Sequence, residues 1–316
     1  MGVVILGKMC YSENDISAAV RLVSRGFAVS RGFPGAGPAG DPLKTEVFAM
    51  YEKIDRIVRE AGKIVLSAHH ISDSVQEKTS HCDLVTKYDT MVQDFLYREL
   101  LAAFPEAGFY GEEGDVLEIA DKRGYFIVDP IDGTTNFIRR ARHSSINVGY
   151  YLDGQMEYGA VYQPYTDELF TAQRGCGAYL NGRPIRMNDL PLSESIIMFG
   201  SAIYYRQTIP LTAQLMAELL PAVLDFRRSG TAGLDLCYVA AGRVDAFVEC
   251  CLRPWDYAAA SLIIQEAGGI VTALDGSPLR FIDRCSVAVG SPQSHPELMK
   301  LVGRVLQQPD MKGRLP

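Results

Sequence analysis

The stretch of the chain that could do chemistry is Tyr125–Phe137, in which Asp129 and Asp132 stand on either side of Ile131. It begins as a short apolar run typical of a buried strand, and we expect the strand to stop at Asp129 because the proline that follows has no N–H to donate. A Gly-Thr-Thr segment then offers free N–H groups and hydroxyls. Two carboxylates and a main-chain carbonyl beside such donors suit a divalent cation bridged to a phosphate. The ordinary alternative is a turn, since Asp-Pro and Asp-Gly are common turn dipeptides.

Further acids lie at the ends of other predicted elements. Glu112 and Glu113 lie between glycines after a short predicted strand. One predicted turn separates them from the strand that carries Asp129. Two neighbouring strands could therefore deliver Glu112 and Asp129 to the same end of a sheet. Glu249 is expected to end a strand, and Asp256 directly precedes a predicted helix. Solvation on a loop explains adjacent glutamates equally well, and helix capping alone explains Asp256.

Five of these acids form a candidate site that contains no histidine or cysteine: Glu112, Asp129, Asp132, Glu249 and Asp256. Ligation by oxygen alone is what Mg²⁺ prefers, with Mn²⁺ as a substitute. Several carboxylates in one pocket would repel one another without cations. Two or more bound cations can clamp a phosphate, generate hydroxide and stabilise the departing alkoxide. Since the chain has no Gly-x-Ser-x-Gly elbow and no P-loop, the sequence predicts metal-assisted phosphoester hydrolysis.

The elements that position these acids follow from the periodicity of the sequence. Residues 77–89 are polar and predict a short hairpin or loop. This segment holds Lys78, which a solvated loop position explains, and Asp89, which can cap the helix that follows. Asp153-Gly154 and Asn181-Gly182 each separate two alternating runs, so both predict two-residue hairpins. The middle of the chain should therefore be an antiparallel sheet, while strands and helices alternate in the last third.

The composition shifts along the chain and predicts three parts. Residues 31–42 are rich in glycine and proline, a weak helix is expected over 13–29, and a clear helical period begins at Thr45. The predicted parts are a poorly ordered extension at 1–44, an α+β half at 45–190 that carries most of the metal ligands, and an α/β half at 191–316 that completes the site.

Size, charge and cysteine content bound the function. The 316 residues include 31 Lys and Arg against 38 Asp and Glu, a net charge of −7, which argues against direct nucleic-acid binding. No apolar run is long enough to span a membrane, so no membrane partner is expected. The 7 cysteines include no Cys-x-x-Cys pair, which predicts reduced thiols in a cytoplasmic protein.

Several of these segments, taken in order, resemble the inositol monophosphatase family. The resemblance runs from about Thr45 to Leu306 and rests on these motifs: Gly111-Glu112-Glu113, Asp129-Pro-Ile-Asp132-Gly-Thr-Thr-Asn-Phe137, Gly175-x-Gly-Ala-x-x-Asn-Gly182, Trp255-Asp256-x-Ala-Ala and Glu266-Ala-Gly-Gly269. It implies a layered α-β-α-β-α sandwich, with a largely antiparallel sheet in the N-terminal half and a mixed sheet in the C-terminal half. It also implies a homodimer that depends on Mg²⁺ and is sensitive to Li⁺.

The same resemblance implies a set of metal ligands. Glu112, Asp129 and the Ile131 carbonyl would hold one Mg²⁺, and Asp129, Asp132 and Asp256 would hold a second. Glu112 would share a third, looser ion with water. The site would thus contain two or three ions, all bound by oxygen.

Catalytic and substrate-binding roles are also carried over by motif. Thr134, paired with Asp89 and assisted by Glu112, would orient the attacking water, and the N–H groups of Gly133 and Thr134 would grip the phosphate. The full set implied to contact the substrate is Glu112, Ile131, Asp132, Gly133, Thr134, Gly230, Thr231, Ala232, Glu249 and Asp256. Lys78 and Glu113 would lie nearby.

The identity of the small phosphomonoester stays open at this point. Inositol-1-phosphate is favoured, because a carboxylate at Glu249 can accept hydrogen bonds from ring hydroxyls. Histidinol phosphate, fructose 1,6-bisphosphate or a 3′-phosphonucleotide are alternatives, because the basic loop at 139–142 could meet a second anionic group. A further alternative is a regulatory or scaffolding protein that keeps the fold without catalysis.

Overall fold

The computed structural model describes residues 4–6, 9–11, 42–78, 80–115, 117–311 and 313–316. These fall into two units, Met1–Arg56 and Ile57–Pro316, and the boundary lies inside helix α2 (Pro42–Leu66). In the first unit, strands β1 (Val4–Leu6) and β2 (Met9–Tyr11) pair in antiparallel fashion. Helix α2 begins three residues before the predicted Thr45, and the weak helix expected at 13–29 lies outside the described residues. The three-part division of the chain stays a prediction.

An eight-stranded sheet carries the first half of the site. Its strands, in spatial order, are β12 (Arg183–Ile185), β11 (Ala178–Leu180), β10 (Glu168–Gln173), β9 (Gln155–Gln163), β8 (Ser145–Leu152), β7 (Gly124–Asp132), β5 (Gly108–Gly111) and β6 (Leu117–Glu118). The pairings are antiparallel except between β5 and β7, which run parallel. The largely antiparallel sheet predicted from the sequence is confirmed.

Two-residue turns fix the register of this sheet. Leu152 pairs with Gln155 across Asp153-Gly154, and Leu180 pairs with Arg183 across Asn181-Gly182. All four turn residues have positive φ, as a type I′ turn requires, because its twist matches that of the strands. A third, smaller hairpin pairs β3 (Gln76–Glu77) with β4 (Leu84–Val85), as the polar segment 77–89 predicts.

A five-stranded mixed sheet forms the second half. Its spatial order is β14 (Asp225–Arg227), β13 (Ile196–Phe199), β15 (Ala246–Leu252), β17 (Cys285–Gly290) and β16 (Ile270–Thr272). Strands β14, β13 and β15 are parallel, whereas β17 is antiparallel to both β15 and β16. The mixed sheet is thus also as predicted.

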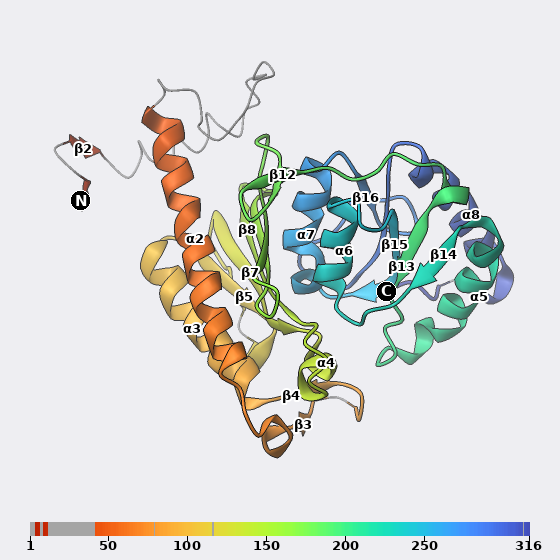
Figure 1. Cartoon of the computed structure of the whole chain (residues 1–316), viewed down its shortest axis with the longest axis horizontal. Helices are drawn as coiled ribbons and strands as arrows, with labels where there is room; N and C mark the ends of the chain where they lie inside the picture. Colours follow the sequence, from red (N-terminus) through yellow and green to blue (C-terminus); the bar gives the residue numbers. More distant parts are fainter. Residues whose placement is uncertain (1–3, 7–8, 12–41, 79, 116, 312) are drawn as a thin grey trace. The chain divides into compact units, whose positions relative to one another are not determined.

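Helices separate and cover the two sheets within Ile57–Pro316 (Figure 1). Helix α3 lies on the outer face of the eight-stranded sheet, α6 and α7 lie between the sheets, and α5 and α8 cover the far side of the five-stranded sheet. Their bounds are α3 (Lys87–Ala103), α5 (Ile209–Leu219), α6 (Ala232–Ala240), α7 (Pro254–Glu266) and α8 (Ser294–Leu306). Helix α7 is apolar on all sides because sheets and α6 surround it, and Tyr257 and Ile263 are fully buried. The α-β-α-β-α sandwich is therefore confirmed.

Two strands continue further than the sequence suggests. Strand β7 does not stop at Asp129 but runs on to Asp132, with a register shift between these residues. The irregular pairing leaves the proline between them with no ladder bond to make. Strand β15 likewise does not end at Glu249 but continues to Leu252 through a second irregularity. In both strands the acid therefore lies at a bulge, and bulges commonly redirect side chains next to functional sites.

No helix within the described ranges combines the length and the apolar character needed to cross a lipid bilayer.

Candidate active site

The predicted acids converge on one cavity of about 610 Å³, lined by residues from both halves of the fold. The parallel pairing of β5 with β7 places Gly111 opposite Val128, and the N–H of Glu112 donates to the Val128 carbonyl at 3.1 Å. Glu112, just after β5, therefore lies beside Asp129 in the adjacent strand β7, and the two acids meet as the sequence suggests. The cavity is lined by these predicted residues: Lys78, Glu112, Glu113, Asp129, Ile131, Asp132, Gly133, Thr134, Gly230, Thr231, Ala232, Glu249 and Asp256.

Burial and mutual repulsion dominate the electrostatics of the acids. Burial, followed by the carboxylates of Glu112 and Asp132, raises the pKa of Asp129 well above its usual range. Asp256 has a similarly raised pKa, caused by burial and then by Asp132 and Glu112. Each aspartate therefore senses acids from other elements, which shows that residues far apart in the chain share one site.

Asp132 is held by the start of helix α6. Its Oδ2 accepts hydrogen bonds from the Gly233 N–H at 2.6 Å and from Asn147 Nδ2 at 3.3 Å. Burial raises its pKa to about 7, although these donors oppose the rise. The N-terminus of a helix also favours an anion, so the second half of the fold helps to place a ligand carried by the first half.

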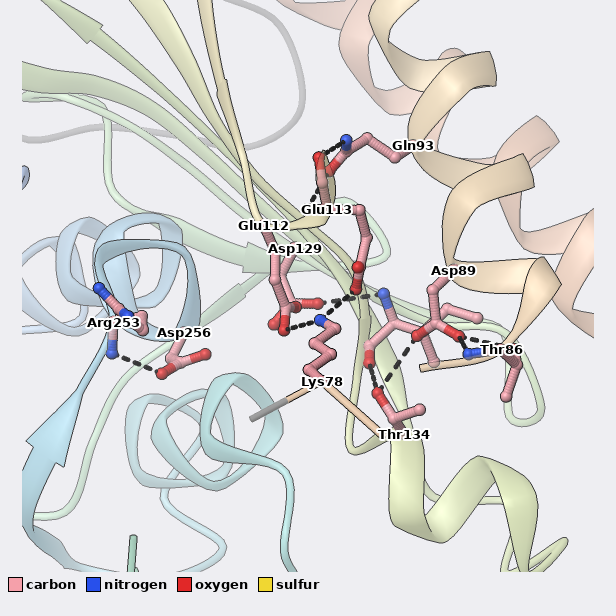
Figure 2. Close-up of polar contacts among 11 residues, drawn as sticks. Lys78, Thr86, Asp89, Gln93, Glu112, Glu113, Asp129, Thr134, Arg253 and Asp256 are labelled. Carbon is pink, nitrogen blue, oxygen red and sulfur yellow. Dashed lines mark hydrogen bonds and ion pairs between the residues drawn. The ribbon is translucent and has the colours of Figure 1, made fainter. Parts of the chain in front are cut away.

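Thr134 lies at the start of the short helix α4 (Thr134–Ile138), with its hydroxyl 3.2 Å from Asp89 Oδ1 and 3.0 Å from the Ile131 carbonyl oxygen. Figure 2 shows the Thr134 and Asp89 side chains facing each other. Gly133, which directly precedes Thr134, has a φ of 84°, and a Cβ there would lie 2.4 Å from Thr231 Oγ1. Only glycine fits this turn without strain.

Asp89 does not cap helix α3 in the way that the sequence suggests. Thr86 is the N-cap residue, and Asp89 is the third helical residue of a capping box, accepting from the Thr86 N–H at 2.8 Å. Burial raises the pKa of Asp89 to about 6. Asp256 occupies the same position in α7, where its Oδ2 accepts from the Arg253 N–H at 2.7 Å. In both helices one carboxylate oxygen binds the start of the helix, and in Asp89 the other accepts from the Thr134 hydroxyl.

Lys78 reaches from the β3–β4 hairpin into the acidic cluster (Figure 2). Its Nζ lies 2.9 Å from Glu112 Oε1 and 2.6 Å from Glu113 Oε1. Burial lowers the pKa of the ammonium group, but the two glutamates outweigh it and raise the pKa above its usual value. Burial, and then Glu112, raise the pKa of Glu113 to about 7. Lys78 is thus a partner of the site and not a solvated loop residue.

Gln93 fixes the glutamate turn and was not found from the sequence. Its Oε1 accepts from the Glu113 N–H at 2.8 Å, and its Nε2 donates to the Glu113 carbonyl at 2.5 Å. Gln93 is buried, and Figure 2 shows it reaching from α3 to the turn. It faces inward on the apolar side of that helix, so a polar residue in an apolar stripe was the one available signal.

Glu249 lies on the opposite wall of the cavity and is buried. It accepts from the Ala202 N–H at 3.0 Å, and it packs so closely that a Cβ at Gly200 would lie 1.8 Å from its Oε2. Burial raises the pKa of Glu249 to about 8. Asp235, another buried acid that lines the cavity, was not singled out from the sequence, because it reads as an ordinary helix residue.

The segment Gly230–Ala232 is tied to the first half of the fold. Asn136 Nδ2 donates to Thr231 Oγ1 at 3.2 Å and to the Ser229 carbonyl at 3.0 Å, and the Thr231 hydroxyl donates to the His143 carbonyl at 3.0 Å. These bonds close the cavity beside Gly133. The predicted alcohol-side residues are therefore adjacent to the predicted phosphate-binding turn.

The basic loop at 139–142 does not line the cavity within the described part of the chain. The arginines that do are Arg228, Arg253 and Arg284, from three separate segments in the second half. The secondary alternative, in which this loop meets a second anionic group, therefore passes to a different set of basic side chains. Arg228 stands close to Gly230 in the sequence, and Arg253 stands close to Asp256. This proximity was the only sequence indication that these arginines line the cavity.

The donor set suits Mg²⁺. The carboxyl groups, together with the Ile131 carbonyl that lines the cavity, provide oxygen ligands without nitrogen or sulfur. The raised pKa values of Asp129 and Asp256 reflect negative charge that burial leaves uncompensated, which a cation would balance. In the ranges that the structure describes, no three of the carboxyl groups close around a single point as the ligands of one ion do. The side chains thus share a cavity, and binding of an ion requires them to draw together.

The sequence model of the inositol monophosphatase family matches residues 49–307. The chain belongs to that family. Among its curated relatives, the Nus factor SuhB of Escherichia coli (strain K12) is 36% identical over 241 residues, which are 75% of this chain and 90% of the relative. The inositol-1-monophosphatase of Bacillus subtilis (strain 168) is 34% identical over 250 residues, 78% and 94% of the two chains. The crystal structure of SaIMPase-II with inositol monophosphate bound has a TM-score of 0.69 at 30% identity, covering 80% of this chain and 92% of that one.

Proposed function

We propose that this member of the inositol monophosphatase family hydrolyses a small phosphomonoester with Mg²⁺, and that inositol-1-phosphate is its first candidate substrate. The observation that carries the proposal is the convergence of Glu112, Asp129, Asp132 and Asp256 on one cavity beside the Gly133–Thr134 turn. Phosphatase activity and dependence on a metal are general in the family, which supports the proposal of metal-assisted hydrolysis.

In this proposal the metal ligands are those that the family motif implies. One Mg²⁺ would be held by Glu112, Asp129 and the Ile131 carbonyl. A second would be held by Asp129, Asp132 and Asp256. A third would be shared by Glu112 and water. When bound, the ions supply charge for the phosphate and a water of lowered pKa. Mn²⁺ would substitute, since it accepts the same oxygen ligands.

The protein groups position the reactants around those ions. The Thr134 hydroxyl, already within hydrogen-bonding distance of Asp89, orients the attacking water, and Glu112 assists it. The N–H groups of Gly133 and Thr134 bind the phosphate oxygens. Asp89 is placed to accept the proton that Thr134 relays, because its pKa of about 6 lies near neutrality.

The alcohol side of the substrate meets the wall formed by Gly230–Ala232 and Glu249. A buried carboxylate such as Glu249 can accept hydrogen bonds from ring hydroxyls, which favours a polyol. A relative named inositol-1-monophosphatase and a structural neighbour with inositol monophosphate bound support the same choice. Histidinol phosphate, fructose 1,6-bisphosphate and 3′-phosphonucleotides stay as alternative substrates.

The test is a phosphate-release assay over a panel of phosphomonoesters with Mg²⁺, repeated with Li⁺. We expect inositol-1-phosphate to rank among the best substrates, with activity lost in EDTA and reduced by Li⁺. If another ester ranks far above inositol-1-phosphate, the substrate assignment fails. If no phosphomonoester is hydrolysed, the catalytic proposal fails as a whole.

A regulatory role is the second candidate, because several curated relatives carry the name Nus factor SuhB. Because of these relatives, the expectation that this chain does not bind nucleic acid has no support from the comparison. The presence of every family ligand in this chain favours retained catalysis. Wild-type protein that is inactive on the whole panel but retains a specific macromolecular partner would favour the regulatory role.

The proposal also includes a homodimer in the cytoplasm. Six described cysteines are free thiols, as expected for a reducing compartment. Sedimentation at micromolar concentration would test the dimer.

A further inference from the structure

One wall of the cavity carries three arginines that the proposed hydrolysis does not use. Arg228 lies just before helix α6, Arg253 is the N-cap residue of α7, and Arg284 lies just before β17. All three line the same cavity as the acidic cluster. The cavity is therefore lined by basic as well as acidic side chains, and the arginines come from three segments distant in sequence.

Neutral groups hold each of these arginines in place. Arg228 Nε donates to the Ser201 hydroxyl at 3.0 Å, and Ser201 also lines the cavity. The Arg284 guanidinium lies 4.6 Å from the centre of the Tyr205 ring, and its Nη1 is 3.9 Å from Cys251 Sγ. The Arg253 guanidinium lies 5.5 Å from the centre of the Trp255 ring. Such contacts orient a guanidinium without neutralising its charge.

Within the described residues, none of Arg228, Arg253 and Arg284 forms an ion pair with a carboxylate. The contrast is with Arg243, which is paired with Glu168. Arg228 lies near enough to Glu249 to oppose the burial-driven rise in its pKa, but not near enough to pair with it. The guanidinium donors on this wall are therefore largely available to a ligand.

We propose that this wall is a second anion subsite, and that the substrate carries an anionic group on its alcohol part in addition to the scissile phosphate. The inference rests on the proposed phosphomonoesterase activity but changes the order of its substrates: it favours the anionic alternatives, such as fructose 1,6-bisphosphate and 3′-phosphonucleotides, over inositol-1-phosphate. Arginine recognises carboxylate and phosphate through paired, charge-assisted hydrogen bonds, so the shared chemistry is an oxyanion. A cavity of about 610 Å³ is large enough to hold both a phosphate and a second charged group.

The subsite would act on substrate choice and not on the hydrolytic step. The Ser201 hydroxyl, oriented by Arg228, adds a neutral donor at the same wall. A neutral polyol leaves the arginines hydrated, whereas an anionic group would replace that water with direct bonds. The gain should therefore be seen mainly in KM.

The experiment compares matched substrates on purified full-length protein with Mg²⁺. Glycerol 2-phosphate and 2-phosphoglycerate differ only in that one hydroxymethyl group is replaced by a carboxylate. myo-Inositol 1-phosphate and myo-inositol 1,4-bisphosphate form the phosphate arm, so the two pairs distinguish the kinds of oxyanion. We expect the anionic member of at least one pair to have a kcat/KM roughly tenfold higher or more.

Arg228→Gln, Arg253→Gln and Arg284→Gln test the residues, with Arg183→Gln as the matched control. Arg183 is exposed on β12 and does not line the cavity. Arg228→Gln and Arg284→Gln should raise KM for the anionic member roughly tenfold, while KM and kcat for the neutral member stay near the wild-type values. Arg253→Gln, whose main-chain N–H holds Asp256, should also raise KM for the anionic member. The ratio between variant and wild type cancels any intrinsic difference between the two esters, including their own Mg²⁺ binding.

Three results would overturn the inference. If the wild type hydrolyses both members of each pair equally well, the subsite does not exist, although the phosphatase activity stands. Equal losses for both members in Arg228→Gln and Arg284→Gln, with circular dichroism unchanged, would show a structural role. If no substrate is hydrolysed at all, the proposed function fails and the subsite fails with it.

Discussion

Gln93 offers a sharp prediction, because it holds the turn that carries Glu112 without being a ligand itself. Gln93→Met keeps the length of the side chain but removes both hydrogen bonds to the Glu113 main chain, at 2.8 and 2.5 Å. Each buried polar group that is left unpaired costs about 1–3 kcal/mol, so the loss of two partners should lower the free energy of unfolding by about 2–6 kcal/mol. The freed turn should also let the Glu112 carboxylate move away from Asp129.

The matched control is Gln163→Met. Gln163 is also buried and also makes two main-chain bonds, donating to the Arg142 carbonyl and accepting from the Tyr165 N–H, both at 3.2 Å. Neither of those partners lines the cavity. Both variants should therefore lose stability, but only Gln93→Met should alter the site.

The assay measures urea unfolding in EDTA and, separately, phosphate release as a function of Mg²⁺ concentration. Residues that orient metal ligands are typically worth 10–100-fold in metal affinity, so Gln93→Met should need about ten times more Mg²⁺ for half-maximal rate. Gln163→Met should keep the wild-type Mg²⁺ dependence. Equal Mg²⁺ dependence in Gln93→Met and wild type would refute the reasoning that Gln93 positions Glu112.

Three further predictions concern the site itself. Thr134→Val, which keeps the shape but removes the hydroxyl that contacts Asp89, should lower kcat at saturating Mg²⁺ by about 100-fold with a similar KM, and a kcat near wild type would exclude the hydroxyl from water positioning. Asp129→Asn should abolish hydrolysis while circular dichroism shows an unchanged fold, and residual activity above a few per cent would contradict its role as a shared ligand. In EDTA, stability should fall as pH rises from about 4.5 through about 8, because the folded protein keeps the proton of Glu249 that the unfolded chain has already released. Glu249→Gln should flatten that part of the profile in urea titrations, and an unchanged slope would contradict the raised pKa.

Local patterns were enough to predict much of the fold. Asn-Gly and Asp-Gly between alternating runs identified both type I′ hairpins, because only such residues accept two successive positive φ values. The order of Glu112 and Asp129 in the sequence correctly indicated that the two acids meet, through the parallel pair β5 and β7. Of the site residues that the motif resemblance implied, all but Asp89 line the cavity, and Asp89 contacts the Thr134 hydroxyl from beside it.

The differences arise where tertiary context overrides a local rule. Proline normally ends a strand, but β7 passes through Pro130 because the register shift there needs no N–H. Asp89 reads as a cap from its position alone, whereas Thr86 precedes it and fills that role. Gln93 and Arg284 are distant in sequence from any motif, so their place at the site depends on pairings that no single segment encodes.

The most direct test of the central claim is a crystal structure with Mn²⁺ in place of Mg²⁺, read by anomalous scattering. The carboxylates of Glu112, Asp129, Asp132 and Asp256, with the Ile131 carbonyl, should surround at least two anomalous peaks at about 2.1–2.2 Å, and those side chains should have drawn together. Saturating Mn²⁺ with no peak in this cavity, or peaks only at other acidic positions, would contradict the proposed metal-assisted hydrolysis.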